Sequence, residues 1–500
     1  MTPEAIDVIV AENASLKEEN RRLRDEIAEL KERVEWFTRQ IYGQKSERYV
    51  PAVEGQTELD LGVAPTAQQP QQNEHIAYDR KKAARHTPHG REEIPSHLPR
   101  KQQIILPSED VSGMEKIGEK VTEQVEYTAP QCWVRQIVRP VFAGVINGIR
   151  TVVCAELPPQ CNEKGKFGAS MISHVTTAKF EDHLPIYRLQ RQLARDSGMM
   201  IPEATLDRLP QIAGFWLGTV ADRLTRQVLE SGYVQLDEST LRVMIKPTNG
   251  KSSTGYMWVA HSPLQRIVSF TYDRHRSGKV SEKILGSYRG ILQTDCYAAY
   301  DRYSRMEHII HAGCHAHARR GFDESMQGDK SRATYALELY RSLFAIEQEA
   351  RTAGMDHARR LAYRQEKALP VLLAFKSWLD ENVRQVKPKS AIGKAILYCL
   401  NHWNRLIRYL DDGRIEISNN LVENCIRPLA IGRKNWLFAG SESMAKMMGD
   451  IYTVQGTCKL HGINFFTYLT ALLEELPNRT GTASAIDDLL PMNWKPEVQA

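Results

Sequence analysis

The sequence predicts a multidomain protein of mixed α/β structure, and three features of its 500 residues support this fold class. A heptad repeat near the N-terminus predicts a coiled coil. A stretch rich in Gln, Pro and His precedes residue 100. Short alternating segments of strand type are followed by long segments of helical periodicity, which is typical of an α/β protein. With 42% hydrophobic residues, the chain can bury a sizeable core.

The composition excludes several classes of protein. No segment approaches the roughly 18 uninterrupted apolar residues that a membrane span needs, and charges from Glu12 onward interrupt any secretory signal. Eight cysteines without a paired C-x-x-C array are typical of reduced thiols in the cytoplasm. The net charge of +5 permits nucleic-acid binding without predicting it, so local clusters must carry that inference.

Residues 1–49 are predicted to form a coiled-coil dimerisation helix. One apolar seam repeats every seven residues at Ile9, Leu16, Leu23, Leu30 and Phe37, and the other seam carries Ile6, Asn13, Asn20, Ile27 and Val34. Glutamates at the g positions would meet Lys or Arg at the e positions of a partner, and Asn at a favours two parallel strands. We therefore expect a homodimer or a higher homo-oligomer. The alternative is a single solvated amphipathic helix.

Residues 50–102 are predicted to be a flexible linker, because they contain too few large apolar residues to offset the entropy of ordering. The basic run DRKKAARHTPHGR within it either contacts DNA phosphates or is a solvated tail. Residues 103–160 contain alternating runs such as QVEY and WVRQIV, which predict a small β-rich module.

Residues 161–212 are predicted to be a helix-turn-helix region that binds DNA. A helical stretch, FEDHLPIYRLQRQLARD, is followed by SGMMI and by a second helix, PEATLDRL, with Pro202 at its first position. The second helix of such a motif can enter the major groove. Many helical hairpins share this pattern, and a plain hairpin is the alternative.

Residues 213–455 are predicted to form the catalytic domain, with a helical insertion at about 325–415 and a C-terminal helical segment at 456–500. The segments YVQLDEST, TGYMWVAHS, RIVSFTYDR and GILQTDCYAAY read as four strands, with Asp237 and Asp295 at the ends of the first and fourth. Three hairpin-like strands and then a fourth form the opening order of a ribonuclease H-like sheet, in which these two ends lie side by side. Two carboxylates there suit a pair of Mg²⁺ ions for phosphoryl transfer.

A third carboxylate is expected on the helix that begins near Ser418 or Asn419, either of which can act as N-cap. Glu423 lies in its first turn, with Arg427 four residues later on the same face. The competing acids are Glu238, Asp273, Asp301 and Glu416. Glu238 is the strongest rival, although it should point to the opposite face of the strand from Asp237.

Four blocks of this sequence resemble the insertion-sequence 66 family of transposases: LQTDCYAAY, GCHAHARR, SNNLVENCIRPLAIGRKNWLFAGS and TCKLHGINFFTYL. The resemblance extends to IYGQKSERY and to SHVTTAKFEDHLPIYRLQRQLAR, and so covers nearly the whole chain. It implies a DDE mechanism in which Asp237, Asp295 and Glu423 are catalytic and bind two Mg²⁺ ions, with Mn²⁺ as a substitute.

The resemblance implies that the DNA partners are the terminal inverted repeats of a bacterial insertion sequence and a target site, with accessory proteins of the same element as further partners. It implies a cytoplasmic, nucleoid-associated protein. The candidate phosphate contacts are Arg319, Arg320, Arg427, Arg433 and Lys434. A ribonuclease H-like nuclease or resolvase, which cuts without joining, is one alternative function. A catalytically inactive DNA-binding derivative is the other.

The chain departs from the family in the β-rich module, where family members carry zinc-binding cysteine pairs. Cys132, Cys154 and Cys161 lack the pairing to supply about four ligands, so no zinc is predicted and apolar packing alone should hold the module. The C-H-x-H tract at 314–317 has no second ligand pair nearby, and His315 stands where the family has Trp. Cys296 replaces a glycine beside the second acid, where the backbone has to turn.

Overall fold

The computed structural model describes residues 94–495, with gaps at residues 95, 97, 109–110, 112–113, 129–130, 147–148, 164, 247–250 and 480–482. The predicted coiled coil at residues 1–49 and most of the predicted linker lie outside the described residues. Everything described belongs to one unit, His89–Ala500. Within the described part, no helix is long and apolar enough to cross a lipid bilayer.

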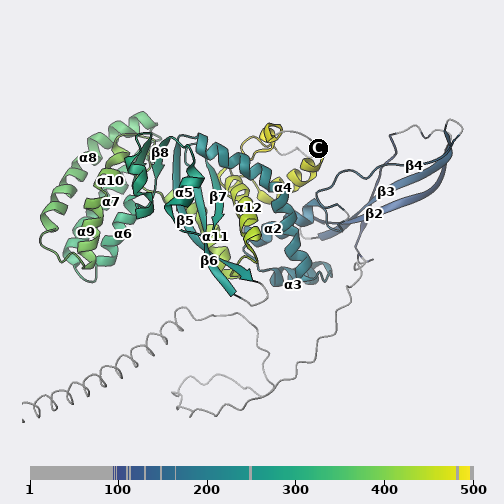
Figure 1. The fold of residues 1–500 in the computed structure, drawn as a ribbon, viewed down its shortest axis with the longest axis horizontal. Coiled ribbons are helices and arrows are strands. Elements are labelled where there is room, and N and C mark those ends of the chain that lie inside the picture. Colours follow the sequence, from purple (N-terminus) through teal and green to yellow (C-terminus); the bar gives the residue numbers. More distant parts are fainter. Residues whose placement is uncertain are drawn as a thin grey trace, which may run out of the picture. The chain divides into compact units, whose positions relative to one another are not determined.

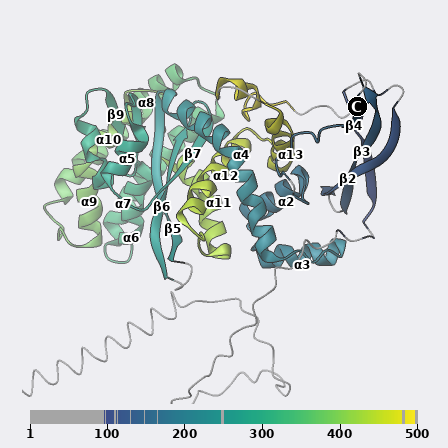
Figure 2. The ribbon, with the colours of Figure 1, turned by 45° about the vertical axis from the view of Figure 1, so that its right-hand side comes forward.

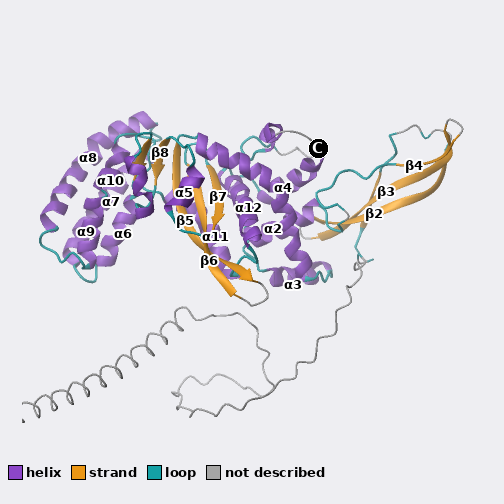
Figure 3. Ribbon diagram, viewed as in Figure 1, coloured by secondary structure: helices purple, strands orange, loops and turns teal. Residues whose placement is uncertain are grey.

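A four-stranded sheet occupies the region of the predicted β-rich module (Figure 3). Its strands are β1 (Arg100–Ile104), β2 (Glu115–Thr128), β3 (Gln131–Ile146) and β4 (Ile149–Cys154). β3 is central: β2 pairs with it antiparallel along one edge, and β1 (parallel) and β4 (antiparallel) share the other edge.

Apolar packing holds only one end of this module. Val125 and Val134 are fully buried at the end that contacts the helices, whereas Val145 and Val152 are exposed at the far end. A buried carboxylate also contributes, because Glu126 forms an ion pair with Arg135 at 3.1 Å. The expectation that apolar contacts alone hold the module is therefore wrong.

Three helices follow the module: α2 (Ala169–Phe180), α3 (Ile186–Ser197) and α4 (Glu203–Glu230). The helical stretch predicted from Phe180 is interrupted, because α2 ends there and α3 begins only after Pro185. Gly198, with a φ of 69°, ends α3 in the left-handed conformation that glycine adopts without strain. α4 then runs unbroken across residue 212, where the sequence pattern suggests a boundary, because buried apolar residues continue at helical spacing to Val228.

A five-stranded sheet lies at the centre of the chain (Figure 1). Its strands are β5 (Tyr233–Lys246), β6 (Lys251–Ser262), β7 (Ile267–Asp273), β8 (Gly290–Gln293) and β9 (Ile309–Ala312), in the order β7-β6-β5-β8-β9. β5, β6 and β7 are antiparallel neighbours, and β8 and β9 join β5 in parallel. Helix α5 (Gly278–Leu285) and the 3₁₀ segment η2 (Ala298–Arg305) connect the last strands.

The main core lies between this sheet and the helices α4, α11 (Asn420–Trp436) and α12 (Glu442–Leu460), with α13 (Phe465–Glu475) packed on α2. α12 contacts both α4 and β7, and the two views of the ribbon show these elements side by side (Figures 1 and 2). Gly449 permits the close approach of α12, because a Cβ there would lie 2.7 Å from the carbonyl oxygen of Phe270 on β7. Three-residue and seven-residue 3₁₀ turns, η4 (Leu476–Asn478) and η5 (Ala483–Leu489), end the described chain.

A group of helices lies between β9 and α11, in the region of the predicted insertion, and has a second core of its own. Its helices are α6 (His315–Ser325), α7 (Lys330–Thr352), α8 (His357–Asn382), α9 (Ala391–Asn401) and α10 (Trp403–Leu406), followed by η3 (Ile407–Leu410). The segment 391–410 has a continuous helical composition, but its helix is broken after Asn401. In both ribbon views these helices lie beyond β8 and β9, on the opposite side from α4 and α12 (Figures 1 and 2).

Candidate active site

The register of β5 and β8 places Asp237 beside Asp295. Gln235 and Gln293 are directly paired on these parallel strands, and each aspartate lies two residues further along. Neighbouring strands are about 4.8 Å apart, and side chains two residues apart along a strand share a face. The two glutamine side chains do share a face, since Gln235 Nε2 donates to Gln293 Oε1 at 2.9 Å. The two aspartates therefore follow on that face.

Asp295 comes just after the end of β8, but Asp237 does not end its strand. β5 continues from Asp237 to Lys246 and stays paired with β6, so the expectation that the first strand ends at this acid is wrong. The extra length lets β5 also contact the C-terminal end of α11, where Arg433 donates to Ser239 Oγ at 3.0 Å.

A buried glutamine sets the position of the third acid. Asn419 is the N-cap of α11, but its side chain makes no capping hydrogen bond. Gln235 Oε1 instead accepts from the backbone N–H of Val422 at 3.1 Å, and Gln235 Nε2 donates to the carbonyl of Ser418 at 3.2 Å. The first turn of α11, with Glu423 in it, is thus fixed to β5 two residues before Asp237. Gln235 and Gln293 were not among the residues that the sequence pattern singles out.

The electrostatics of the site favour a cation. Burial raises the pKa of Asp237 to about 8, and the negative charges of Asp295, Glu238 and Glu423 add to the effect. Glu423 Oε1 is buried without a hydrogen-bond partner among the described residues, and the nearest basic group is His317 Nδ1 at 3.6 Å. A divalent cation would offset both the crowding of negative charge and the unpartnered oxygen.

The three acids do not form a closed coordination shell as they stand. Within the described part of the chain, no three His, Cys, Asp or Glu side chains approach closely enough to hold a metal ion. Asp237 Oδ1 accepts from the N–H of Glu238 at 2.8 Å, and Asp295 Oδ1 accepts from the N–H of Tyr297 at 2.9 Å. The remaining oxygens have to turn toward one another for a metal to bind.

The raised pKa of Asp237 predicts how stability depends on pH. An aspartate in the unfolded chain has a pKa of about 4, whereas the pKa of Asp237 in the folded protein is about 8. Between these values the folded protein keeps a proton that the unfolded chain releases, so the metal-free protein should lose stability as pH rises. Urea unfolding in EDTA from pH 5 to 9 measures this slope. Asp237→Asn should flatten it, and parallel curves for variant and wild type would contradict the prediction.

The competing acids are engaged elsewhere. Glu238 accepts hydrogen bonds from Arg276 Nε and from Tyr300 Oη, each at 2.5 Å. Glu416 forms a bidentate pair with Arg360 at 2.8 and 2.9 Å. Arginine partners of this kind occupy the carboxylate oxygens that a metal would need.

The other two rivals are also occupied: Asp301 pairs with Arg405 at 2.7 Å, and Asp273 Oδ1 accepts from the N–H of His275 at 2.8 Å. Of the acids that the sequence suggests, Glu238, Asp301 and Glu416 have an arginine partner among the described residues, whereas Asp237, Asp295, Glu423 and Asp273 have none. Asp273 instead lies 3.3 Å from His275 Nδ1.

The candidate phosphate contacts on α11 differ from one another. Arg427 and Lys434 are exposed and seven residues apart, so they project from the same side of the helix. Arg433 is half-buried and also donates to Thr240 Oγ1 at 2.9 Å, which ties α11 to β5. Arg427 and Lys434 are therefore free to meet a ligand, whereas Arg433 has a structural role.

The two candidate phosphate contacts on α6 also differ, because only one of them has an ion-pair partner among the described residues. Arg319 is exposed and pairs with Asp323 one turn later at 3.0 Å. Arg320 is exposed and lines a cavity between α6 and α9.

The C-H-x-H tract does not converge on one point. Cys314 Sγ accepts from the N–H of Asn419 at 3.4 Å, and His315 Nε2 lies 2.9 Å from the carbonyl oxygen of Leu406. His315 is buried in the core of the insertion, where burial lowers its pKa to about 4 and keeps it neutral. Of this tract, only His317 faces the acids.

Cys296 has a left-handed backbone conformation, with a φ of 66°, and is buried. A non-glycine residue there costs about 1–3 kcal/mol, which accounts for the glycine of the family pattern. We expect Cys296→Gly to stay within about 1 kcal/mol of the wild type, since relief of strain offsets the lost burial, and Cys296→Val to be about 1–2 kcal/mol less stable than Cys296→Gly. Urea unfolding measures the stability of both variants, and equal stability would contradict the proposed backbone strain at Cys296.

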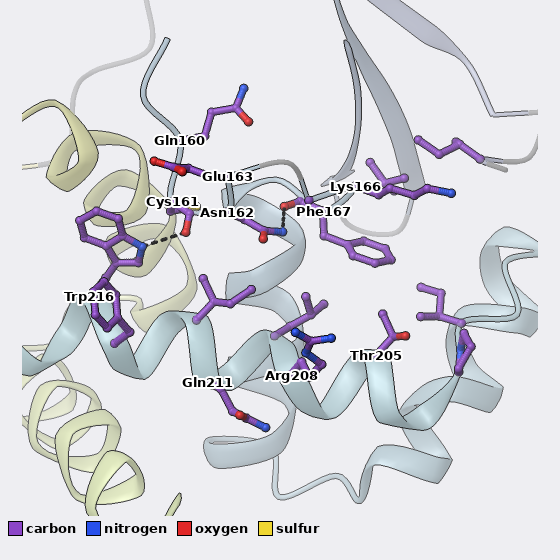
Figure 4. Close-up of a pocket in the computed structure, with 18 of the residues that line it drawn as sticks. Gln160, Cys161, Asn162, Glu163, Lys166, Phe167, Thr205, Arg208, Gln211 and Trp216 are labelled. Carbon is purple, nitrogen blue, oxygen red and sulfur yellow. Dashed lines mark hydrogen bonds between the residues drawn. The ribbon is translucent and has the colours of Figure 1, made fainter. Parts of the chain in front are cut away.

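A larger cavity of about 1060 Å³ lies in the predicted helix-turn-helix region, away from the three acids. The segment before α2, the α3–α4 turn and the first half of α4 line it (Figure 4). Trp216 Nε1 donates to the carbonyl of Cys161 at 2.9 Å, and Asn162 Nδ2 donates to that of Phe167 at 3.0 Å. The first bond anchors the segment between β4 and α2 on α4, and the second closes a turn within that segment.

Comparison with known proteins gives three family matches. The model described as "Transposase IS66 family" matches residues 164–447, "Transposase C of IS166 homeodomain" matches 29–102, and "IS66 C-terminal element" matches 453–492. Two uncharacterised proteins of Sinorhizobium fredii are similar over almost their whole length. Protein y4qI is 32% identical over 97% of this chain and 93% of its own, and y4jD is 29% identical over 94% and 95%.

Proposed function

Because the chain belongs to the IS66 family of transposases, we propose that it binds the terminal inverted repeats of a bacterial insertion sequence and catalyses metal-dependent cleavage and transfer of DNA strands. The observation that carries this proposal is the placement of Asp237 beside Asp295, with Glu423 pinned nearby through Gln235. The raised pKa of Asp237 supports it, because burial and then the negative charges of Asp295, Glu238 and Glu423 disfavour its ionised form unless a cation is bound.

The strand order supports a ribonuclease H-like catalytic domain. Three antiparallel strands, followed by two that join the first in parallel, bring residues 58 positions apart in the sequence to adjacent strand positions. In this proposal α11 supplies the third acid, and the helices α6–α10 are an insertion between the second and third acids.

Asp237, Asp295 and Glu423 would hold two Mg²⁺ ions, or Mn²⁺ in their place. When bound, such a pair supplies an activated water or 3′-hydroxyl and stabilises the leaving oxygen of an in-line displacement. The chain itself fixes two of the acids through the Gln235–Gln293 pair and keeps competing carboxylates bound to Arg276 and Arg360. The exposed cations Arg320, Arg427 and Lys434 would contact DNA phosphates, together with Arg319 once its pair with Asp323 opens.

The test is a strand-transfer assay with the full chain and DNA that carries the element's own ends. We expect nicking at the element's 3′ end only when Mg²⁺ or Mn²⁺ is present, and then joined product with a target duplex. Nicking without any joined product would favour a ribonuclease H-like nuclease or resolvase. Binding to the ends without nicking in either metal would favour an inactive derivative.

The predicted coiled coil gives a separate test of assembly. A peptide of residues 6–37 should form a parallel dimer at micromolar concentration, because Glu at g and Lys or Arg at e pair between two parallel strands. Sedimentation equilibrium measures its mass. A peptide that stays monomeric at several hundred micromolar would rule out a dimer built on this segment. Accessory proteins of the same element are further proposed partners.

A further inference from the structure

A cavity of about 380 Å³ lies between α6 and α9, and two of its lining residues contact Asp295 and Glu423. His317 and Arg320 line it from α6, and Lys394 and Tyr398 line it from α9. The cavity is therefore built jointly by the segment after β9 and by the helical insertion. Its volume lies in the range of small-ligand sites, about 300–1,000 Å³, which suits one nucleotide.

Two of the lining side chains contact the acids directly or through the backbone. Tyr398 Oη donates to the carbonyl oxygen of Asp295 at 2.6 Å. His317 Nδ1 lies 3.6 Å from Glu423 Oε1. A ligand in the cavity would therefore lie against the second and third acids of the proposed site.

The charge of the cavity favours an anion. Arg320 and Lys394 are both exposed, and neither side chain has an ion pair within the described residues, in contrast to Arg319, which pairs with Asp323. One carboxylate, Glu324, also lines the cavity. Two fixed positive charges against one negative charge leave the cavity positive, while the neighbouring acids are strongly negative.

We propose that this cavity binds a single nucleotide of the DNA strand next to the phosphate that is cut, with Arg320 and Lys394 on its phosphate group. This inference rests on the proposed function, because it takes the three acids as the place where the strand is cut. A phosphate is the anion that a DNA strand presents at every nucleotide, and Lys and Arg are the side chains that neutralise it. The insertion then contributes directly to substrate binding, through α9.

The test compares Lys394→Gln and Arg320→Gln with the matched control Lys389→Gln in the full chain. Lys389 is exposed just before α9 and lies outside the cavity. The probe is a labelled single-stranded thymidine oligonucleotide, whose binding is followed by fluorescence anisotropy without metal and over a range of salt. Because no metal is present and no cleavage is measured, the result does not depend on whether the chain transposes DNA.

We expect Lys394→Gln and Arg320→Gln each to weaken oligonucleotide binding roughly threefold to tenfold. In a plot of the logarithm of affinity against the logarithm of salt concentration, each variant should show a shallower slope, equivalent to the loss of about one phosphate contact. Lys389→Gln should bind as the wild type does. In strand cleavage, both cavity variants should raise KM while kcat stays within about twofold, since they lose a contact that is the same before and during the reaction.

Three results would overturn the inference: no oligonucleotide binding by the wild type, unchanged affinity and salt slope in Lys394→Gln, or an equal loss in Lys389→Gln. Oligonucleotide binding can follow the expected pattern while neither the wild type nor any variant cuts DNA. In that case the cavity is a nucleotide site and the proposed catalytic function fails. If the wild type cuts and joins DNA while Lys394→Gln matches it throughout, the function stands and the cavity assignment fails.

Discussion

Asp237→Asn and Glu423→Gln should each lower the rate of strand cleavage by roughly 10³-fold or more while DNA binding is kept. Each change preserves the size of the side chain and removes one carboxylate from a buried group of acids, in which burial and the charges of Asp295, Glu238 and Glu423 raise the pKa of Asp237. Mg²⁺ is held in proteins by few carboxylates, so the loss of one should impair occupancy at both positions. Single-turnover nicking of end-labelled DNA in Mg²⁺ measures the rate.

The matched controls are Glu238→Gln and Glu416→Gln. Glu416 is tied to Arg360, so its amide should reduce stability but keep cleavage within about fivefold at a temperature where the variant is folded. Groups that act as one unit are not additive, so the double variant Asp237→Asn/Glu423→Gln should be hardly worse than either single one. Loss of cleavage in Glu416→Gln with activity kept in Glu423→Gln would reassign the third acid. An active Asp237→Asn would remove the metal site altogether.

The adjacency of the first and fourth strands of the sheet, with an aspartate on or just after each, could be predicted from the sequence. Period-two alternation marks the strands, and β8 carries an acid just beyond its end. The length of β5 could not be predicted in this way. Its continuation past Asp237 depends on pairing with β6, a contact with a partner strand that local pattern does not reveal.

The amide network that positions the acids could not be found from the sequence either. Gln235 bonds Gln293, Ser418 and Val422, which lie 58 to 187 residues away. A glutamine in a strand-like segment usually predicts a solvated face, because glutamine is mostly exposed. Only the fold shows that Gln235 is fully buried and satisfied. A glutamine two residues before an aspartate in each of two strand-like segments, VQLD and LQTD, is the weak signal that existed.

The positions at which helices break could also be predicted only in part from the sequence. The sequence around residues 181–185 keeps a helical composition, yet α2 ends at Phe180 and Pro185 precedes α3. A proline disfavours the helical conformation of the residue before it, which does indicate a break. The opposite error occurs in α4, where Pro210 lies inside a continuous helix whose turns on both sides of it carry buried residues. Tertiary packing decided only this second case.

The second large effect is expected in the core of the insertion, where an arginine and a glutamate are buried together. Arg364 is fully buried, and its Nε and Nη2 atoms donate to Glu347 at 2.7 and 2.8 Å. Arg360 also donates to Glu347 at 2.7 Å, and Arg364 Nη1 donates to the carbonyl of Tyr409 at 2.8 Å. Burial would raise the pKa of Glu347, but the two guanidinium groups hold it below its usual value and keep the carboxylate charged.

Arg364→Met should therefore destabilise the insertion by about 3–5 kcal/mol, because it leaves the charge of Glu347 buried with only one partner. The double variant Arg364→Met/Glu347→Leu should recover part of that loss, since it removes both charges and fills a similar volume. Asp380→Asn is the control: its pair with Lys376 on α8 is exposed and should be worth less than about 1 kcal/mol. Urea unfolding followed by tryptophan fluorescence measures all three. If Arg364→Met costs no more than Asp380→Asn, the buried pair does not stabilise the insertion, and α7 and α8 are held together by their apolar core alone.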